Sequence, residues 1–205
     1  TSLRAVELLR TRRLVLRTWR DDDLPAFFDL YSRWEVMRWL GPPPRRSLRD
    51  VQEAGERLAR WHRRAAGLPA PYGLWALVPD LPGAPATGPR GTLLLLPLHD
   101  AEGLTREVEI GWHLHPDYQG RGLITEGAQA LLGAAAAAGL ARILALTDPD
   151  NAASQAVARR LNMADVGLTS RWFGFLTRQF EWTPEPNRTG TEITSAADGP
   201  VGPPR

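Results

Sequence analysis

The sequence predicts one α+β domain built on a mixed sheet. Its 205 residues suit a single compact domain. Hydrophobic residues make up 43% and charged residues 23% of the chain, as is usual for a soluble globular protein. Segments typical of strands and helices follow one another in the order β-α-α-β-β-β-α-β-α-β-β, which favours the α+β class. From Pro184 onward the chain loses all periodicity, so we expect a domain over 1–183 and a disordered tail over 184–205.

The first strand is expected over 12–20, where apolar side chains alternate. Asp21–Asp23 follow it, and they are expected to provide the N-cap and first-turn acids of a helix. A Gly-Pro-Pro-Pro break comes next. Ser47 is expected to cap a second helix that ends near residue 66, with one face formed by Val51, Gly55, Leu58 and His62.

The remaining elements alternate more regularly. Apolar runs bounded by Gly, Pro and Asp turns predict strands, and stripes of 3.6-residue period predict helices. Strands are expected over 72–78, 91–98, 106–114, 142–147, 166–172 and 174–182, and helices over 123–138 and 152–161.

The composition excludes several kinds of chemistry. The chain has no cysteine, and all 25 of its basic residues are arginine. Disulfides, thiolate metal sites, a cysteine nucleophile, a lysine Schiff base and a Walker lysine are therefore excluded. The four histidines lack metal-ligand spacing, so no metal is expected. No membrane-spanning run or export signal is visible, and we expect a cytoplasmic protein that does not bind membranes.

The charge is unevenly distributed. The pI of about 9.6 accompanies a net charge of only +2, because little titrates between pH 8 and 10 without lysine or cysteine. Residues 1–64 hold 15 arginines and 9 acids, whereas 65–205 hold 10 arginines and 14 acids. The arginines of the second helix are interpreted either as a solvated surface or as part of a binding region.

Two segments carry candidate chemistry. In the first, Gly120 and Gly122 precede a helix, where glycines allow close backbone approach and free N–H groups favour a phosphate. Thr125 stands where a dinucleotide fingerprint has its third glycine, and no Gly-Lys-Ser/Thr is present. In the second, Asn151 and Ser154 open the next helix. Either could simply be a helix cap.

Together these segments resemble the coenzyme A site of the GNAT superfamily of N-acyltransferases. The motif Gln/Arg-x-x-Gly-x-Gly/Ala is matched by Gln119-Gly120-Arg121-Gly122-Leu123-Ile124, with Ile124 departing from the small residue. Residues 11–17 and the run EIGWHLHPDY are similar to the RimJ/RimL-like branch, which acetylates ribosomal-protein N-termini. The resemblance spans nearly all of 10–182. It implies a mixed, mostly antiparallel sheet flanked by helices, with two strands splayed at the acyl-CoA site.

The resemblance implies a role for each matching residue. The donor acetyl-CoA would be held by Trp112, His113, Leu114, Gln119, Gly120, Arg121, Gly122, Leu123, Ile124, Thr125, Asn151 and Ser154. Glu109 is expected to be the general base, acting through water. Glu107 and His113 are the alternative bases, and both glutamates could instead be exposed strand residues. Ser154 would assist the leaving thiolate, because Ala158 occupies the position of the tyrosine that many relatives use.

The expected function is transfer of acetyl from acetyl-CoA to a primary amine, by direct attack in a ternary complex. The acceptor could be a protein N-terminus, an antibiotic, a polyamine or another amine, and a homodimer is compatible with the sequence. Two alternatives are a catalytically silent CoA-binding module and an arginine-rich ribosome- or RNA-binding protein. The module is favoured by Ile124 and by Asn162-Met163, which replace the family's Gly-Phe. Direct nucleic-acid binding is not expected, since aromatic RNA-binding motifs are missing.

Overall fold

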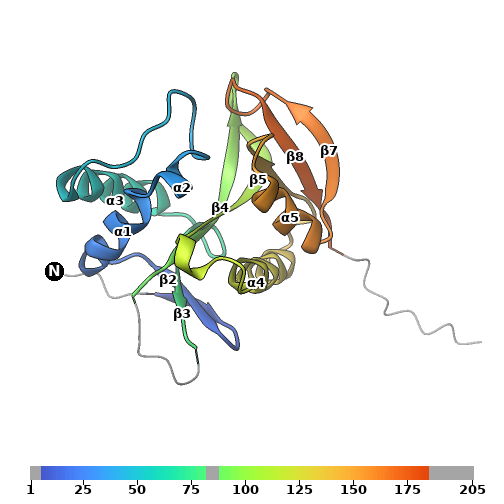
Figure 1. Cartoon of the computed structure of the whole chain (residues 1–205). Helices are drawn as coiled ribbons and strands as arrows, with labels where there is room; N and C mark the ends of the chain where they lie inside the picture. Colours follow the sequence, from blue (N-terminus) through green and yellow to red (C-terminus); the bar gives the residue numbers. More distant parts are fainter. Residues whose placement is uncertain (1–5, 82–87, 185–205) are drawn as a thin grey trace, which may run out of the picture.

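The computed structural model describes residues 6–81 and 88–184. It forms an eight-stranded sheet in the order β1-β2-β3-β4-β5-β6-β8-β7, with helices on both faces (Figure 1). Every neighbouring pair is antiparallel except β5 and β6, which are parallel. The expected α+β class and mostly antiparallel sheet are therefore confirmed, while the predicted tail lies outside the described residues apart from Pro184.

The strands are β1 (Glu7–Arg10), β2 (Leu14–Thr18), β3 (Gly73–Pro79), β4 (Gly91–Asp100), β5 (Gly103–Leu114), β6 (Ile143–Thr147), β7 (Ala164–Thr169) and β8 (Thr177–Trp182). The helices are α1 (Leu24–Tyr31), α2 (Trp34–Met37), α3 (Val51–Ala65), α4 (Leu123–Ala137) and α5 (Ala152–Arg160), with short 3-10 turns η1 (Asp21–Asp23) and η2 (Pro116–Tyr118). None of the helices among the described residues is long and apolar enough to cross a membrane.

The N-terminal region differs from the prediction in three ways. The strand expected over 12–20 is β2, but an unpredicted strand, β1, precedes it and pairs with it as a hairpin. The aspartates form η1 rather than capping α1, because Asp23 turns inward to pair with the buried Arg17 at 2.6 Å. The short helix α2 was not predicted; its four residues are too few for a helical period to show.

Helix α3 begins later than predicted. Its N-cap is Asp50, whose side chain accepts a hydrogen bond from the Glu53 N–H at 2.8 Å, so the Ser47 cap is wrong. Val51 is 49% exposed, whereas Ala54 and Leu58 are buried. The face of α3 that packs against α1 is therefore rotated from the predicted one.

The sheet separates two layers of apolar packing. On one face, Leu93 and Ile110 of the sheet meet α4 and α5. Helix α4 lies close here, since a Cβ added to Gly127 would come within 2.7 Å of Leu93. On the other face, α1, α2 and α3 cover a cluster that includes Tyr31 and Ala76. The sheet, including its centre where β5 meets β6, therefore lies between two layers of helices.

Strands β5 and β6 separate soon after they meet. They share one register pair, Glu109 with Leu144, although β4 pairs with β5 up to Leu114 and β8 pairs with the whole of β6. The β6-facing backbone edge of β5 beyond residue 109 is therefore free of strand pairing, as the splayed-strand expectation required. The β7–β8 hairpin has shorter strands than predicted, with residues 170–176 forming its connection.

Candidate active site

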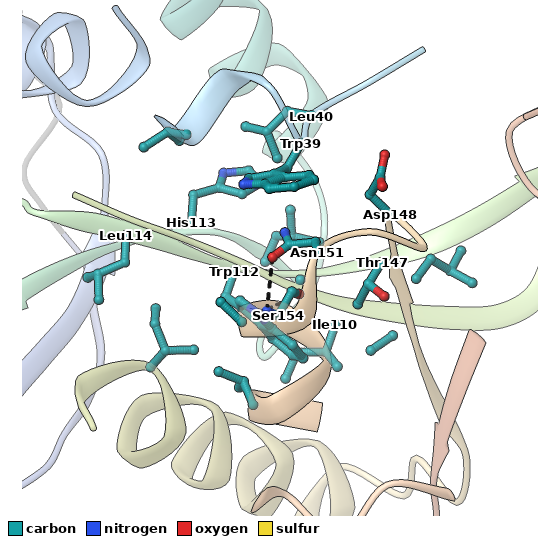
Figure 2. Close-up of a pocket in the computed structure, with 18 of the residues that line it drawn as sticks. Trp39, Leu40, Ile110, Trp112, His113, Leu114, Thr147, Asp148, Asn151 and Ser154 are labelled. Carbon is teal, nitrogen blue, oxygen red and sulfur yellow. Dashed lines mark hydrogen bonds between the residues drawn. The ribbon is translucent and has the colours of Figure 1, made fainter. Parts of the chain in front are cut away.

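A cavity of about 1280 Å³ lies where β5 and β6 diverge. Helices α2 and α3 border one side, and the loop before α4, strand β6 and helix α5 border the other. Figure 2 shows Trp39, Leu40 and His113 on one side of it and Asn151 and Ser154 on the other. Of the predicted site residues, all line this cavity except Arg121.

The loop before α4 exposes backbone donors to the cavity. Gly120 and Gly122 adopt φ values of +73° and +74°, a conformation that glycine adopts without strain. Gly122 is the N-cap of α4, so the N–H groups of the first helical turn lack partners within the helix. Arg13, which immediately precedes β2, holds this turn, because its guanidinium donates to the Arg121 carbonyl at 2.9 Å and to Glu126 at 2.6 Å.

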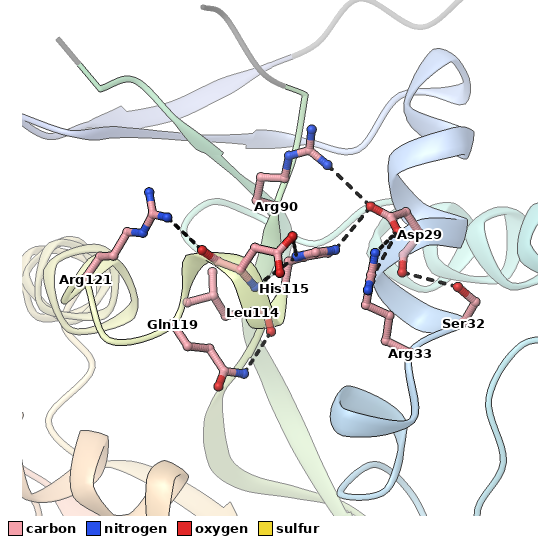
Figure 3. Close-up of polar contacts among 9 residues, drawn as sticks. Asp29, Ser32, Arg33, Arg90, Leu114, His115, Gln119 and Arg121 are labelled. Atoms are coloured by element: carbon pink, nitrogen blue, oxygen red, sulfur yellow. Dashed lines mark hydrogen bonds and ion pairs between the residues drawn. The ribbon is translucent and has the colours of Figure 1, made fainter. Parts of the chain in front are cut away.

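Arg121 itself points away from the cavity. Its guanidinium donates to the Asp117 carbonyl at 2.9 Å and lies 5.1 Å from the centre of the Tyr118 ring. Figure 3 shows it directed toward the η2 turn. The Arg121 side chain therefore stabilises the turn, and it does not line the cavity as the expected donor-binding role would require.

A polar network joins the end of β5 to α1 (Figure 3). The buried His115 accepts the Asp117 N–H at Nδ1, and its Nε2 lies 3.2 Å from the Asp29 carboxylate. Asp29 also pairs with Arg33 at 2.7 Å and with Arg90 at 3.5 Å. This network connects the α1 layer to the loop that precedes α4.

Ser154 is held from both sides. Its Oγ accepts the Trp112 indole N–H at 3.1 Å, and its backbone N–H donates to Asn151 Oδ1 at 3.1 Å (Figure 2). Asn151 is thus the N-cap of α5 while it lines the cavity. With one acceptor lone pair occupied, the Ser154 hydroxyl retains its proton for a group in the cavity. Ala158 is fully buried and takes no part in the lining.

The two candidate glutamates have different surroundings. Glu109 lines the cavity, and burial raises its pKa to about 7, with Arg64 opposing the rise. Glu107 instead pairs with Arg142, which also binds Glu181 at 2.8 Å, and lies outside the cavity lining. Of the two, Glu109 has access to the cavity, and its raised pKa suits it to accept a proton near neutrality.

His113 belongs to a buried hydrogen-bond chain. Its Nδ1 lies 2.9 Å from the Tyr31 hydroxyl, which lies 2.7 Å from Thr92 Oγ1. Burial lowers the pKa of His113 to about 4, with Arg57 adding to the effect. The imidazole is therefore neutral at pH 7, and its second nitrogen is available as an acceptor or donor.

Other lining residues were missed by the sequence reasoning. Thr147 is buried, and its hydroxyl has no hydrogen-bond partner among the described residues. Asp148 pairs with Arg45 at 2.6 Å, which ties the segment after α2 to the loop before α5. Thr147 and Asp148 depend on contacts between distant segments, for which the sequence carries no local signal. Tyr31, Trp39 and Trp61 also line the cavity, as expected from the resemblance, which implies that the region of the first two predicted helices borders the acyl-acceptor groove.

The described residues hold no cluster of three or more His, Asp or Glu side chains that could bind a metal ion.

A known protein family and several solved structures match this chain. Residues 13–164 fit the family model of the "Acetyltransferase (GNAT) domain". A Salmonella typhimurium acetyl transferase that modifies the N-terminal serine of ribosomal protein L7/L12 superposes with TM-score 0.65 at 18% identity, covering 88% of this chain and 100% of that one. RimL in complex with coenzyme A gives 0.66 at 19%, covering 87% and 98%.

A third solved structure is the microcin C7 self-immunity acetyltransferase MccE in complex with acetyl-CoA and AMP. It superposes with a TM-score of 0.66 at 13% identity, covering 85% of this chain and 94% of that chain. At these identities the superpositions show a shared fold.

Proposed function

The chain belongs to the GNAT acetyltransferase family, and from that premise we propose that it transfers the acetyl group of acetyl-CoA to a primary amine. The observation that carries this proposal is the open edge of β5 beside a cavity that ends at the N-terminus of α4. A pantetheine arm can pair with such an edge as an added strand would, and a pyrophosphate suits a helix N-terminus.

The acetyl-CoA donor would lie along the whole length of the gap between β5 and β6. Its pyrophosphate would accept hydrogen bonds from the backbone around Gly120, Gly122 and Thr125. Its pantetheine amides would meet the backbone of residues 112–114, and Asn151 and the unpartnered Thr147 hydroxyl lie on the opposite wall. Backbone N–H groups of β5 would then point at the thioester oxygen, where negative charge develops during acyl transfer.

The reaction proposed is direct attack in a ternary complex. The amine nitrogen forms a bond to the thioester carbon as the carbon–sulfur bond breaks, and the amine proton passes through water to Glu109. The Ser154 hydroxyl donates a hydrogen bond to the departing thiolate. Glu109 releases its proton to solvent and the thiolate takes one up from solvent, giving an N-acetylated amine and CoA thiol. No covalent enzyme intermediate is required.

A thiol-release screen tests this proposal. Acetyl-CoA and succinyl-CoA are each offered with peptides bearing a free N-terminus and with small amines, and acetyl-CoA binding is followed by calorimetry. We expect thiol release only when an amine is present, with one acylated amine for each thiol. Binding of acetyl-CoA without amine-dependent thiol release would instead indicate a CoA-binding module.

A further inference from the structure

Helix α3 presents a row of arginines to the cavity. Arg57, Arg60 and Arg64 all line it, since residues spaced three and four apart share one face of a helix. None of the three pairs with a carboxylate among the residues that the structure describes. The contrast with Arg46 and Arg49 is clear, because both of those pair with Glu53 at the start of the same helix.

Arg57 is the most enclosed of the row. It is half-buried, its guanidinium donates to the Met37 sulfur at 3.3 Å, and burial followed by the charge of Arg60 lowers its pKa. A guanidinium remains charged in proteins, and a cation withdrawn from water without an anionic partner is unfavourable. This wall of the cavity is therefore prepared for an anion that a ligand would supply.

The cavity as a whole has an excess of positive charge. Besides the α3 row, its lining includes Arg38, Arg45 and Arg160, against only the acids Glu35, Glu109 and Asp148. Asp148 is already neutralised by Arg45. Burial keeps Glu109 partly protonated at neutral pH. An electrostatic potential of one sign within a cleft attracts and retains a ligand of the opposite sign.

The row stands beside the reacting groups rather than beside the phosphate turn. Arg64 is near enough to Glu109 to affect its pKa, and Arg57 does the same for His113. Helix α3 packs on one face of the sheet and α4 on the other, and Figure 1 shows the two helices well apart. The anion that meets the row is thus carried by the acceptor, not by the CoA phosphates.

From these observations we propose that Arg57, Arg60 and Arg64 form an anion-binding subsite for the acceptor. The preferred acceptor is an amine that carries carboxylate or phosphate groups close to its nucleophilic nitrogen, such as an acidic peptide N-terminus. This inference rests on the proposed acetyl transfer and specifies its substrate class. Guanidinium groups suit such ligands because their paired donors match both carboxylate and phosphate oxygens.

The test compares two peptides that differ only in charge. Both begin with a free serine; one continues with aspartate and glutamate, and the other with asparagine and glutamine. We expect the wild-type chain to acetylate the acidic peptide with a kcat/KM about tenfold higher, the worth of roughly one charge-assisted hydrogen bond. This preference should shrink as salt is added. Small amines with and without a carboxylate, run in parallel, tell a peptide acceptor from a small molecule.

Variants of α3 locate the effect. R57Q should remove most of the roughly tenfold preference for the acidic peptide, and the exposed pair R60Q/R64Q a smaller part of it because solvent screens them more. The pair also serves if R57Q fails to fold, as thermal melting would show. The matched control is R63Q, which removes the same charge from an exposed position outside the cavity lining and should leave the preference unchanged.

The outcomes separate this inference from the proposed function. Turnover of the neutral peptides and amines at rates equal to the acidic ones would overturn the subsite and leave acetyl transfer intact. Weaker acetyl-CoA binding in R57Q with an unchanged acceptor preference would assign the row to the donor. A preference for succinyl-CoA that R57Q removes would assign it to the acyl group. Absence of amine-dependent thiol release altogether would remove both proposals.

Discussion

Replacing Glu109 with glutamine should change the pH dependence of turnover in a defined way. Burial raises the pKa of Glu109 to about 7. Since only the ionised carboxylate accepts a proton, about half of the enzyme is competent at pH 7 and roughly a tenth at pH 6. E109Q retains the size of the side chain but cannot act as a base, and a positioned general base contributes about 10²- to 10⁴-fold.

The assay is CoA thiol release at saturating acetyl-CoA over pH 5.5 to 8.5, chosen to bracket that pKa by about 1.5 units on each side. The informative quantity is the ratio of wild-type to E109Q rates, because ionisation of the acceptor amine cancels in it. We expect the ratio to be constant well above pH 7 and to fall about tenfold per unit below it. The control is E107Q, since Glu107 pairs with Arg142 outside the cavity.

Undiminished turnover in E109Q would refute the assignment of the base. A large loss in a His113→Asn variant together with a small one in E109Q would transfer the role to His113. A loss in E109Q that did not vary with pH would show that the side chain positions substrate without exchanging a proton.

The same substitution should also change stability. Between about pH 4.5 and 7 the folded state keeps a proton on Glu109 that the unfolded state has released. Unfolding free energy contributed by this group therefore falls as pH rises through that window. We expect E109Q to exceed the wild type by at most about 3 kcal/mol at pH 8 and to match it at pH 4, as measured by urea denaturation. An equal difference at both pH values would contradict the raised pKa.

Two further substitutions test the donor site. S154A removes the hydroxyl that Trp112 orients, so kcat should fall about tenfold or more while the acetyl-CoA Kd measured by calorimetry changes little; the reverse pattern would make Ser154 a structural residue. G122A forces a side chain into φ +74°, which should cost about 1 kcal/mol and weaken acetyl-CoA binding. Its control is G133A within α4, where an added Cβ meets nothing within 4 Å and thermal stability should rise. Equal acetyl-CoA affinities in the two variants would show that the Gly122 turn does not bind the donor.

Local chemistry explains which parts of the fold the sequence predicts. Helix α4 and its glycine turn are visible because a long apolar stripe and two glycines act over adjacent residues. Asn162 adopts φ +57°, a left-handed conformation that asparagine tolerates at a helix end. By contrast, β1 and α2 have four residues each, too few for periodicity. Asp50 replaces Ser47 as the cap because α3 begins only at Val51, where Asp50 has the extended backbone of an N-cap residue.

The site, like the fold, has parts that local sequence predicts and parts that it does not. The cavity-lining residues near Gly122 and Asn151 follow from motifs that are continuous in the chain. The distinction between Glu107 and Glu109 does not, because it depends on Arg142, which is 35 residues away from Glu107. Alternation along a strand places both glutamates on one face, and only the pairing of distant segments leaves one of them available to the cavity.

The central claim is direct transfer from acetyl-CoA to an amine bound in the same cavity. Initial velocities measured while both substrates are varied test it most directly. A ternary complex predicts double-reciprocal lines that intersect, with no acetyl group retained on the protein. Parallel lines, the mark of a covalent acyl-enzyme, or thiol release that is independent of the amine, would contradict it.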